Sequence, residues 1–435
     1  MMRVPFPGSF VPARWHGLLA LVASTVTAHA QDTLRLADLQ AAAVARDPRG
    51  AQVKLIRDQA ARRLENIRSE RLPSLTVNAQ AQHQSDVTSV PLPGAIMPFK
   101  DTYDAGLGAR LRLLDPSRAP RRVVEEAQAS EAAARVGAAT FAQRLAVNDA
   151  WFMARSLDAQ RQVIEAAITD LDGQLRLARE RVAASAALPS DTALLLAERM
   201  RRRQSLDEVA ANWTTSLTLL ADLTGRVVSG NAVLSSVDLA ARARTARDSL
   251  DAVRVRPEYQ VYRASRDAVQ AREDALRAQD KPRLSAFTRG GYGRPGLNML
   301  SREFDTYWQA GIQLEWAPFD WGVARREREA MAIQRDVIQS EERAFADRLR
   351  RSVQSDLGTI DRLERSLAED ETIIALRERV LRETRLRHSE GVVTVAELID
   401  RDTDLQVARL ALVTHRVELE QARARFLTTL GLEVR

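Results

Sequence analysis

Side chains that could do covalent or metal chemistry are few in this 435-residue sequence. It contains no cysteine, which excludes thiolate metal sites, cysteine nucleophiles, disulfide bonds and a lipidated N-terminal cysteine. Of its five histidines, only His83, His388 and His415 lie beyond residue 30, and they are far apart in the sequence. We therefore expect no catalytic triad, no metal site and no bound cofactor, and we expect that the protein is not an enzyme.

Two kinds of motif suggest phosphate or nucleic-acid binding, but the sequence around each of them does not fit such a site. The segment Gly291–Gly296 matches G-x-G-x-x-G, but a proline-containing loop and another strand follow it where a helix is required. The formal charge is +6, and Arg201-Arg202-Arg203 and Arg325-Arg326 are its densest basic runs. Both runs have acidic residues close by in predicted helices, which indicates solvated helix faces. We therefore expect no nucleic-acid partner.

The first 30 residues have the features of a signal peptide. Arg3 and Arg14 supply a positive charge, residues 17–27 form a short apolar run, and Ala28-His29-Ala30 is a cleavage site of the A-x-A type. The apolar run is too short to span a bilayer. The sequence therefore predicts an exported protein.

The remaining chain repeats one order of signals. Asp47-Pro48 opens a helical stretch that ends at Leu72–Leu75 (LPSL), and Arg256-Pro257 opens a second that ends at Lys281–Leu284 (KPRL). Each feature recurs 209 residues later. We therefore predict a first structural repeat at 31–225, a connector or equatorial region at 226–248 and a second structural repeat at 249–435.

Each repeat contains a very long helix. Residues 115–181 have no proline after Pro120, which allows a helix of about 60 residues, and Gly322–Arg387 is the matching stretch. Leu171, Leu175, Ala178 and Val182 are spaced 4-3-4, the spacing of a coiled-coil seam. Helices of this length must pack side by side as an extended bundle.

Four segments alternate apolar and polar side chains, at about 74–82, 103–113, 283–293 and 306–317. The second places Tyr103 and Leu107 on one face and Arg110 and Arg112 on the other, whereas Phe287 breaks the alternation in the third. Alternation over about ten residues is typical of a membrane-spanning barrel strand, apolar toward lipid and polar toward the lumen. A half-buried sheet of a soluble protein has the same period, so that alternative stays open.

The number of strands predicts an oligomer. An open sheet edge cannot lie in lipid, and one chain supplies only four strands, so several chains must share one barrel. Three copies give twelve strands and leave room for a pore. Trp308 and Trp316, near the ends of one apolar face, suit an aromatic girdle, and the long loops at 87–100 and 294–305 then face outward.

This order of elements, repeated after the signal peptide, resembles the TolC-like outer-membrane factor (outer membrane efflux protein) family over essentially the whole mature chain. The patches that support the resemblance are Leu72–Leu75, Pro318–Gly322 (PFDWG), Arg387–Gly391 (RHSEG) and Val395–Asp400 (VAELID). The resemblance implies a mainly α-helical protein with a transmembrane β-barrel. It would be a homotrimer with a twelve-stranded barrel and a long coiled-coil periplasmic tunnel. It also implies a periplasmic adaptor (membrane fusion) protein and an inner-membrane pump of the RND or ABC type as partners. Many family members carry a lipidated cysteine, and this chain cannot.

The resemblance also places a periplasmic gate at the tips of the helical hairpins. Glu397 and Asp400 match positions of the family's acidic rings, and they lie three residues apart on one helix face. His388 matches a position that latches neighbouring tip helices, and Asp191 matches its acidic partner. Glu397 and Asp400 also suit the N-terminus of an ordinary helix, and His388 also suits a plain surface position, so these alternatives stay open.

Two further groups of residues are candidates. The tip residues Ala187, Leu188, Gly391, Val392 and Val393 are expected to dock the adaptor. Arg110 and Arg112 are expected to face the lumen and favour the transit of anions.

The sequence therefore predicts a passive outer-membrane exit duct that exports drugs or other small toxic compounds and is opened by its adaptor and pump. The outer-membrane component of a type I protein secretion system is the first alternative. A soluble periplasmic coiled-coil scaffold is the second.

Overall fold

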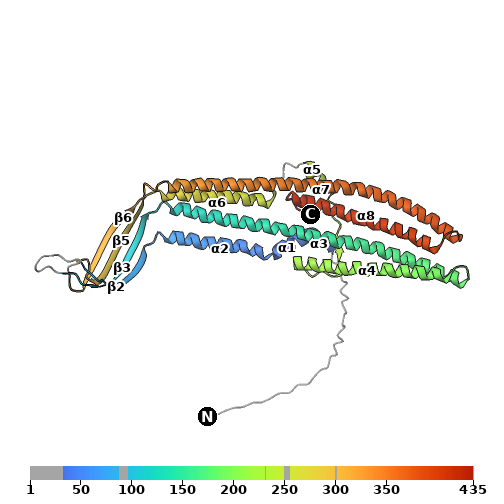
Figure 1. Ribbon diagram of the computed structural model, residues 1–435, viewed down its shortest axis with the longest axis horizontal. Coiled ribbons are helices and arrows are strands. Elements are labelled where there is room, and N and C mark those ends of the chain that lie inside the picture. The colour runs from blue at the N-terminus through green and yellow to red at the C-terminus, as the bar shows by residue number, and fades with distance from the viewer. Residues whose placement is uncertain (1–32, 88–96, 231, 249–254, 299–300, 435) are drawn as a thin grey trace, which may run out of the picture.

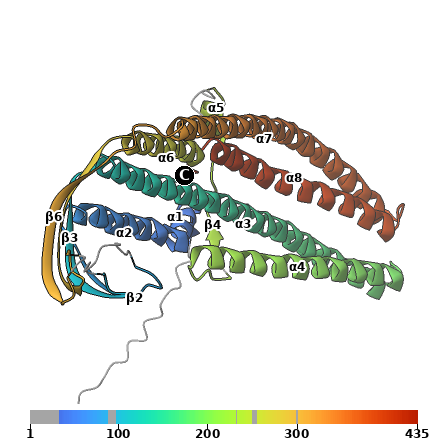
Figure 2. The ribbon, with the colours of Figure 1, turned by 60° about the vertical axis from the view of Figure 1, so that its left-hand side comes forward.

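The structure is a computed structural model, and it describes residues 33–87, 97–230, 232–248, 255–298 and 301–434. The predicted signal peptide and most of the loop at 87–100 lie outside the described residues. The described chain is elongated, with a β-sheet at one end and helices running side by side to the other (Figures 1 and 2). The expected fold class, mainly helical with four strands in one sheet, is confirmed.

The two halves of the chain contain the same elements in the same order. The first half consists of α2 (Pro48–Ser69), β2 (Ser74–His83), β3 (Asp101–Leu114), α3 (Arg118–Ala183) and α4 (Pro189–Thr224). The second half consists of α6 (Pro257–Gln279), β5 (Arg283–Arg294), β6 (Asp305–Glu315), α7 (Val323–Ser389) and α8 (Val395–Thr429). The short elements β1 (Thr33–Leu34), α1 (Leu36–Arg46), β4 (Val233–Leu234) and α5 (Ala240–Asp248) lie near the middle of the molecule.

Local sequence explains where the helices begin. Prolines occupy the first turn of α2, α4 and α6, where the missing N–H is not needed for helix bonding. The longest helices, α3 and α7, have 66 and 67 residues, which corresponds to about 100 Å each. No helix among the described residues combines the length and the apolar character needed to cross a bilayer.

The four long strands form one antiparallel sheet in the order β2-β3-β5-β6. Tyr103 is the register partner of Arg294, and Phe287 is the partner of both Arg110 and Gly311. Phe287 therefore lies on the polar face of the sheet, where its ring covers Gly311. The missing side chain at Gly311 makes room for an aromatic ring that breaks the alternation of β5.

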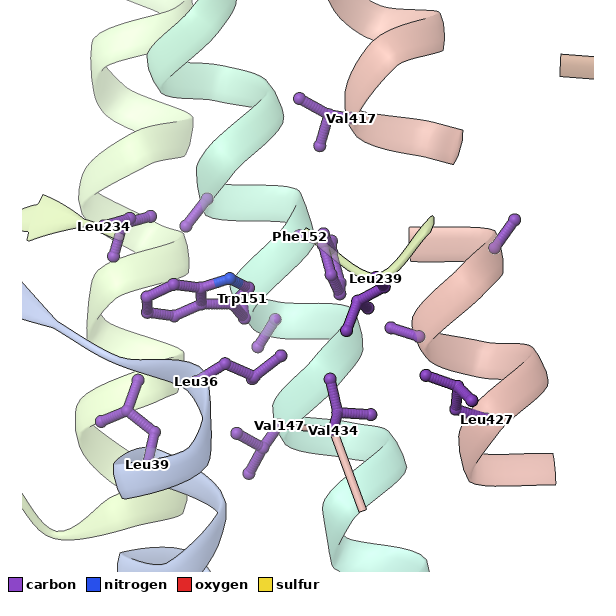
Figure 3. Close-up of a cluster of buried hydrophobic side chains, with 14 of the residues drawn as sticks. Leu36, Leu39, Val147, Trp151, Phe152, Leu234, Leu239, Val417, Leu427 and Val434 are labelled. Carbon is purple, nitrogen blue, oxygen red and sulfur yellow. The ribbon is translucent and has the colours of Figure 1, made fainter. Parts of the chain in front are cut away.

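The main core lies at the middle of the helices, where α1, α3, α4, α5, α7 and α8 meet. Figure 3 shows Trp151 and Phe152 pointing from α3 in different directions, Trp151 toward Leu36 and Phe152 toward Leu239. Both aromatic side chains are almost completely buried. These contacts join segments near both ends of the described chain to α3, and so give the two hairpins a common anchor.

Candidate functional site

The two helical hairpins turn at the end of the molecule that is farthest from the sheet (Figure 1). In the second hairpin, Gly391 adopts a left-handed conformation with φ of 76°, and the N–H of Val392 donates to the carbonyl of Arg387 at 2.9 Å. In the first hairpin, Ser185 takes the left-handed position with φ of 58°, and the N–H of Ala186 donates to Arg181 at 2.8 Å. The two tips therefore use the same tight turn.

The predicted latch residues each bind within their own hairpin. Nδ1 of His388 lies 3.2 Å from the carbonyl oxygen of Val393, and Asp191 accepts the N–H of Leu188 at 3.3 Å. A hydrogen bond between His388 and Asp191 is not among those of the described residues in this single chain. Their pairing stays a prediction, and it now concerns contacts between copies of the chain.

Glu397 and Asp400 lie in the first two turns of α8. The hydroxyl of Thr394 accepts the N–H of Glu397 at 3.3 Å and so caps this helix. Neither acidic side chain forms an ion pair within the described part of the chain, and Asp400 is exposed whereas Glu397 is half-buried. Their neighbours Val395 and Leu398 are buried against other helices. The two carboxylates therefore occupy the other face of α8, without ion-pair partners among the described residues.

The predicted docking residues include two large exposed apolar side chains. Leu188 is 66% exposed and Val392 is 69% exposed, whereas Ala187 and Val393 are half-buried. Exposed apolar side chains at both tips of a protein this polar mark a surface that another protein can cover.

An apolar cluster joins the two hairpins near their tips. Leu171 and Leu175 of α3 pack with Leu195 of α4 and Val395 of α8. Close by, Nη2 of Arg181 donates to the carbonyl of Ser389 at 3.1 Å, which connects the ends of α3 and α7. The hairpins are therefore held together, and they can separate only if this cluster is opened.

A buried ion-pair network reinforces that junction. Nη2 of Arg202 on α4 donates to Oδ2 of Asp402 on α8 at 2.7 Å, and Nε of Arg202 donates to Glu198 at 2.9 Å. Arg385 of α7 donates to Asp170 of α3 at 2.5 Å and lies 3.7 Å from Asp402. These charges connect all four long helices.

The expectation that the run Arg201–Arg203 forms a solvated face is wrong for its middle residue. The side chain of Arg202 is 9% exposed, whereas the side chains on either side are 61% and 64% exposed. The sequence shows three adjacent arginines, but it does not show that α8 lies over the middle one.

Burial and hydrogen bonding shift the pKa values of two acids of this network, Asp402 and Glu198, in opposite directions. Burial raises the pKa of Asp402, and the nearby Arg202 guanidinium offsets part of that shift. Burial also acts to raise the pKa of Glu198, but hydrogen bonds from Arg201 and Arg202 outweigh it and lower this pKa. Of these two acids, Asp402 therefore loses its charge more readily on acidification.

The polar face of the sheet carries the two arginines expected in a lumen. Arg110 is exposed and forms no ion pair within the described residues, whereas Nη1 of Arg112 donates to Glu70 at 3.0 Å. Asp104 on the same face accepts hydrogen bonds from Arg289 of the neighbouring strand β5 and from Tyr307 of β6, one strand further. Arg110 thus differs from Arg112 in having no ion pair among the described residues, and its effect on anions stays a prediction.

The opposite face of the sheet is apolar and exposed. Val77 is 79% exposed and Trp308 is 77% exposed. Aromatic side chains gather at both ends of this sheet. Tyr103, Tyr292 and Phe304 lie at the end far from the helices, and Phe319 and Trp321 pack edge to face near the helical end.

Comparisons with known proteins agree with this architecture. The model of the outer membrane efflux protein family matches residues 249–432. No curated protein sequence matches the chain.

Several solved structures share the fold along almost the whole chain. The channel CusC, described in work on folding and transmembrane channel formation, has a TM-score of 0.69 at 13% identity, covering 92% of both chains. The outer membrane protein VceC of Vibrio cholerae has a TM-score of 0.67 at 15% identity, covering 92% of this chain and 97% of its own. The MtrE outer membrane channel of Neisseria gonorrhoeae, in an open state, has a TM-score of 0.65 at 17% identity, covering 92% and 90%. Residues 249–432 thus match the outer membrane efflux protein family model, and the chain as a whole has the fold of these solved outer-membrane channels.

Proposed function

We propose that this chain is the passive outer-membrane exit duct of a tripartite efflux system. The observation that supports this most directly is the sheet, which has one polar face and one apolar face with side chains such as Val77 and Trp308 almost fully exposed. So large an apolar surface is stable in lipid and not in water. The family match supports a transport protein rather than an enzyme.

The open edges of the sheet favour a homotrimer. Strands β2 and β6 are the two edge strands, and an unpaired edge is too costly in a bilayer. If β2 of one copy pairs with β6 of the next, three copies close a barrel of twelve strands. The three sets of long helices then continue the barrel as a tunnel into the periplasm.

The dimensions of the sheet suit a bilayer. The 11 residues of β6 span roughly 36 Å, or about 25 Å when tilted by 45°, which matches the apolar band of outer-membrane barrels. The aromatic groups at the two ends of the sheet correspond to the girdles found at the two interfaces of such barrels.

We further propose that the hairpin tips form the gate. Three copies of Glu397 and Asp400 around a narrow axis would place six carboxylates there and concentrate cations at the entrance. His388 and Asp191 would contribute contacts between neighbouring copies, and the network around Arg202 and Asp402 would hold the hairpins closed. The adaptor would cover the exposed tip residues Leu188 and Val392, and so shift the equilibrium between the closed and open gate toward the open state.

Small toxic compounds are the proposed cargo, and the inner-membrane pump supplies the energy. The proposal is tested by fractionating cells that express the full chain and by recording from the purified protein in planar bilayers. We expect outer-membrane localisation, heat-modifiable migration on gels, and ion conductance. Deletion of the gene should increase sensitivity to small toxic compounds.

Recovery of the protein in the soluble periplasmic fraction would overturn the proposal and favour a periplasmic scaffold. A deletion strain that loses a secreted protein and keeps its resistance would instead indicate type I secretion.

A further inference from the structure

A cluster of aromatic rings surrounds Arg294 at the end of the sheet that is farthest from the helices. The guanidinium carbon of Arg294 lies 4.5 Å from the ring centroid of Phe99, 5.1 Å from that of Phe304 and 5.6 Å from that of Tyr103. The guanidinium carbon of Arg302 lies 5.0 Å from the ring of Phe99 on the same cluster. We call these five residues the rim cluster.

The two guanidiniums of the rim cluster lack an acidic partner among the described residues. Within the part of the chain that the structure describes, neither Arg294 nor Arg302 forms an ion pair, and Nε of Arg294 is shielded from water without a hydrogen-bond partner. Cation–π contacts hold a guanidinium through its face and leave the N–H groups at its edge free to donate. The rim cluster therefore presents two positive charges with unused donors.

The position of the rim cluster within the sheet determines what it faces. Arg294 is the register partner of Tyr103, so it lies on the apolar face of the sheet. Strands β3 and β5, which carry these two residues, are the inner strands and not the edges. A neighbouring copy that pairs with β2 or β6 would therefore leave the rim cluster uncovered.

On the proposed function, on which this inference rests, the apolar face contacts lipid. The rim cluster then lies at the outer surface, because the helices at the opposite end of the sheet point into the periplasm. The outer leaflet of an outer membrane consists of lipopolysaccharide, whose lipid A carries phosphate groups at the level of the headgroups. Guanidinium matches phosphate in geometry and charge.

We propose that Arg294 and Arg302 bind a phosphate group of lipid A, held in place by the rings of Phe99, Tyr103 and Phe304. The rings fix the two guanidiniums in the lipid interface, where aromatic side chains are stable. The site couples the barrel to the lipopolysaccharide leaflet that surrounds it.

The proposal is tested by measuring the binding of purified lipid A to the intact protein in detergent, for example by native mass spectrometry. We expect bisphosphorylated lipid A to bind about tenfold more tightly than enzymatically dephosphorylated lipid A, as for loss of a charged hydrogen bond. Inorganic phosphate and phosphatidylglycerol serve as two further probes, and we expect both to bind more weakly. Equal binding of phosphorylated and dephosphorylated lipid A would overturn the proposal without any variant being needed.

Variants then locate the site. The double variant Arg294→Gln with Arg302→Gln should lose about tenfold in affinity for lipid A. Arg203→Gln with Arg325→Gln, which removes two exposed arginines from the helices, should bind as the wild type does. Unchanged binding by the rim variant would overturn the proposal. Failure of the wild type to conduct ions in planar bilayers would instead contradict the proposed function, so the two failures are distinguishable.

Discussion

Arg202 on α4 and Asp402 on α8 form a salt bridge of 2.7 Å, and their side chains are 9% and 2% exposed. The two residues belong to different hairpins and are 200 positions apart in the sequence. Because a buried ion is costly without its partner, this contact couples the position of one hairpin to that of the other.

Removing one side of this salt bridge should both destabilise the hairpins and open the channel. We expect Arg202→Met to lower stability by about 3 kcal/mol, because Asp402 remains buried without its main partner. The double variant Arg202→Met with Asp402→Leu should recover part of that loss, because the unpaired carboxylate of Asp402 is gone while Glu198 keeps its hydrogen bonds from Arg201. Thermal unfolding followed by gel migration measures the stability, and planar-bilayer recording measures the open probability.

A matched control separates this coupling from the loss of a positive charge. Arg203→Met removes an arginine whose side chain is 64% exposed on the same helix, and we expect little effect on stability or conductance. If Arg202→Met behaved like Arg203→Met in both measurements, the salt bridge would have no part in closing the hairpins.

The tip acids should determine how the closed channel responds to cations. We expect Glu397→Ala combined with Asp400→Ala to weaken block by a multivalent cation and to reduce cation selectivity, because the proposed ring of six carboxylates is removed. Planar-bilayer recording with the cation on the tip side measures both. Asp58→Ala with Glu65→Ala removes two exposed acids from α2, far from the tips, and should change neither. Unaltered block in the tip variant removes both residues from the gate.

The positions of the strands and long helices could be predicted from local sequence. Alternation placed the first strand at 74–82, and β2 spans Ser74–His83. The stretch at 115–181, which has no proline after Pro120, corresponds to α3, Arg118–Ala183. The positions of these elements follow from the period at which apolar and polar side chains alternate and from the positions of the prolines, which are local properties of the chain.

The contacts between distant segments could not be predicted in the same way. The burial of Arg202 depends on Asp402, and the orientation of Phe287 depends on Gly311 of the next strand. Each is explained by a residue that becomes its neighbour only after folding. For the same reason, the expected pairing of His388 with Asp191 stays untested in a single chain.

The exposed tip residues should be needed for assembly and not for conduction. We expect Leu188→Asp combined with Val392→Asp to abolish resistance in cells, because charges at the tips would disrupt an apolar contact with the adaptor. The purified variant should conduct as the wild type does. Val227→Asp, at an exposed apolar position in the connector that follows α4, far from the tips, serves as the control in both assays. Full resistance in the tip variant would contradict a docking role.

Asp356 should make stability depend on pH. It is buried on α7 and accepts a hydrogen bond from Thr429 at 2.8 Å, and burial raises its pKa above 3.8. The folded state therefore binds the proton more tightly than the unfolded state does. Its contribution to stability falls as pH rises from 3.8 through the raised pKa.

Replacing this carboxyl should remove that dependence. We expect Asp356→Asn to have a higher Tm than the wild type at neutral pH, because the amide has no charge to bury and can still accept from Thr429. The difference should shrink as pH is lowered toward 3.8. Asp347→Asn, at an exposed acid on the same helix, should show no such gain. A Tm difference that stays constant across the pH series would contradict this account.

The absence of a side chain at Gly291 should keep the ring of Tyr307 against the polar face of the sheet and out of the lumen. A Cβ at this position would lie 2.6 Å from the ring of Tyr307, so the absent side chain lets that ring lie flat against the sheet. Tyr307 in turn donates to Asp104 two strands away.

We expect Gly291→Val to push the ring of Tyr307 away from the wall into the lumen, and so to lower single-channel conductance. Gly290→Ala is the matched control, because a Cβ there meets its nearest neighbour at 3.7 Å, an ordinary contact. Adding Tyr307→Ala to Gly291→Val should restore conductance, since the displaced ring is then gone. Low conductance that persists in this double variant would mean that the valine damages the strand itself, and that Tyr307 does not narrow the pore.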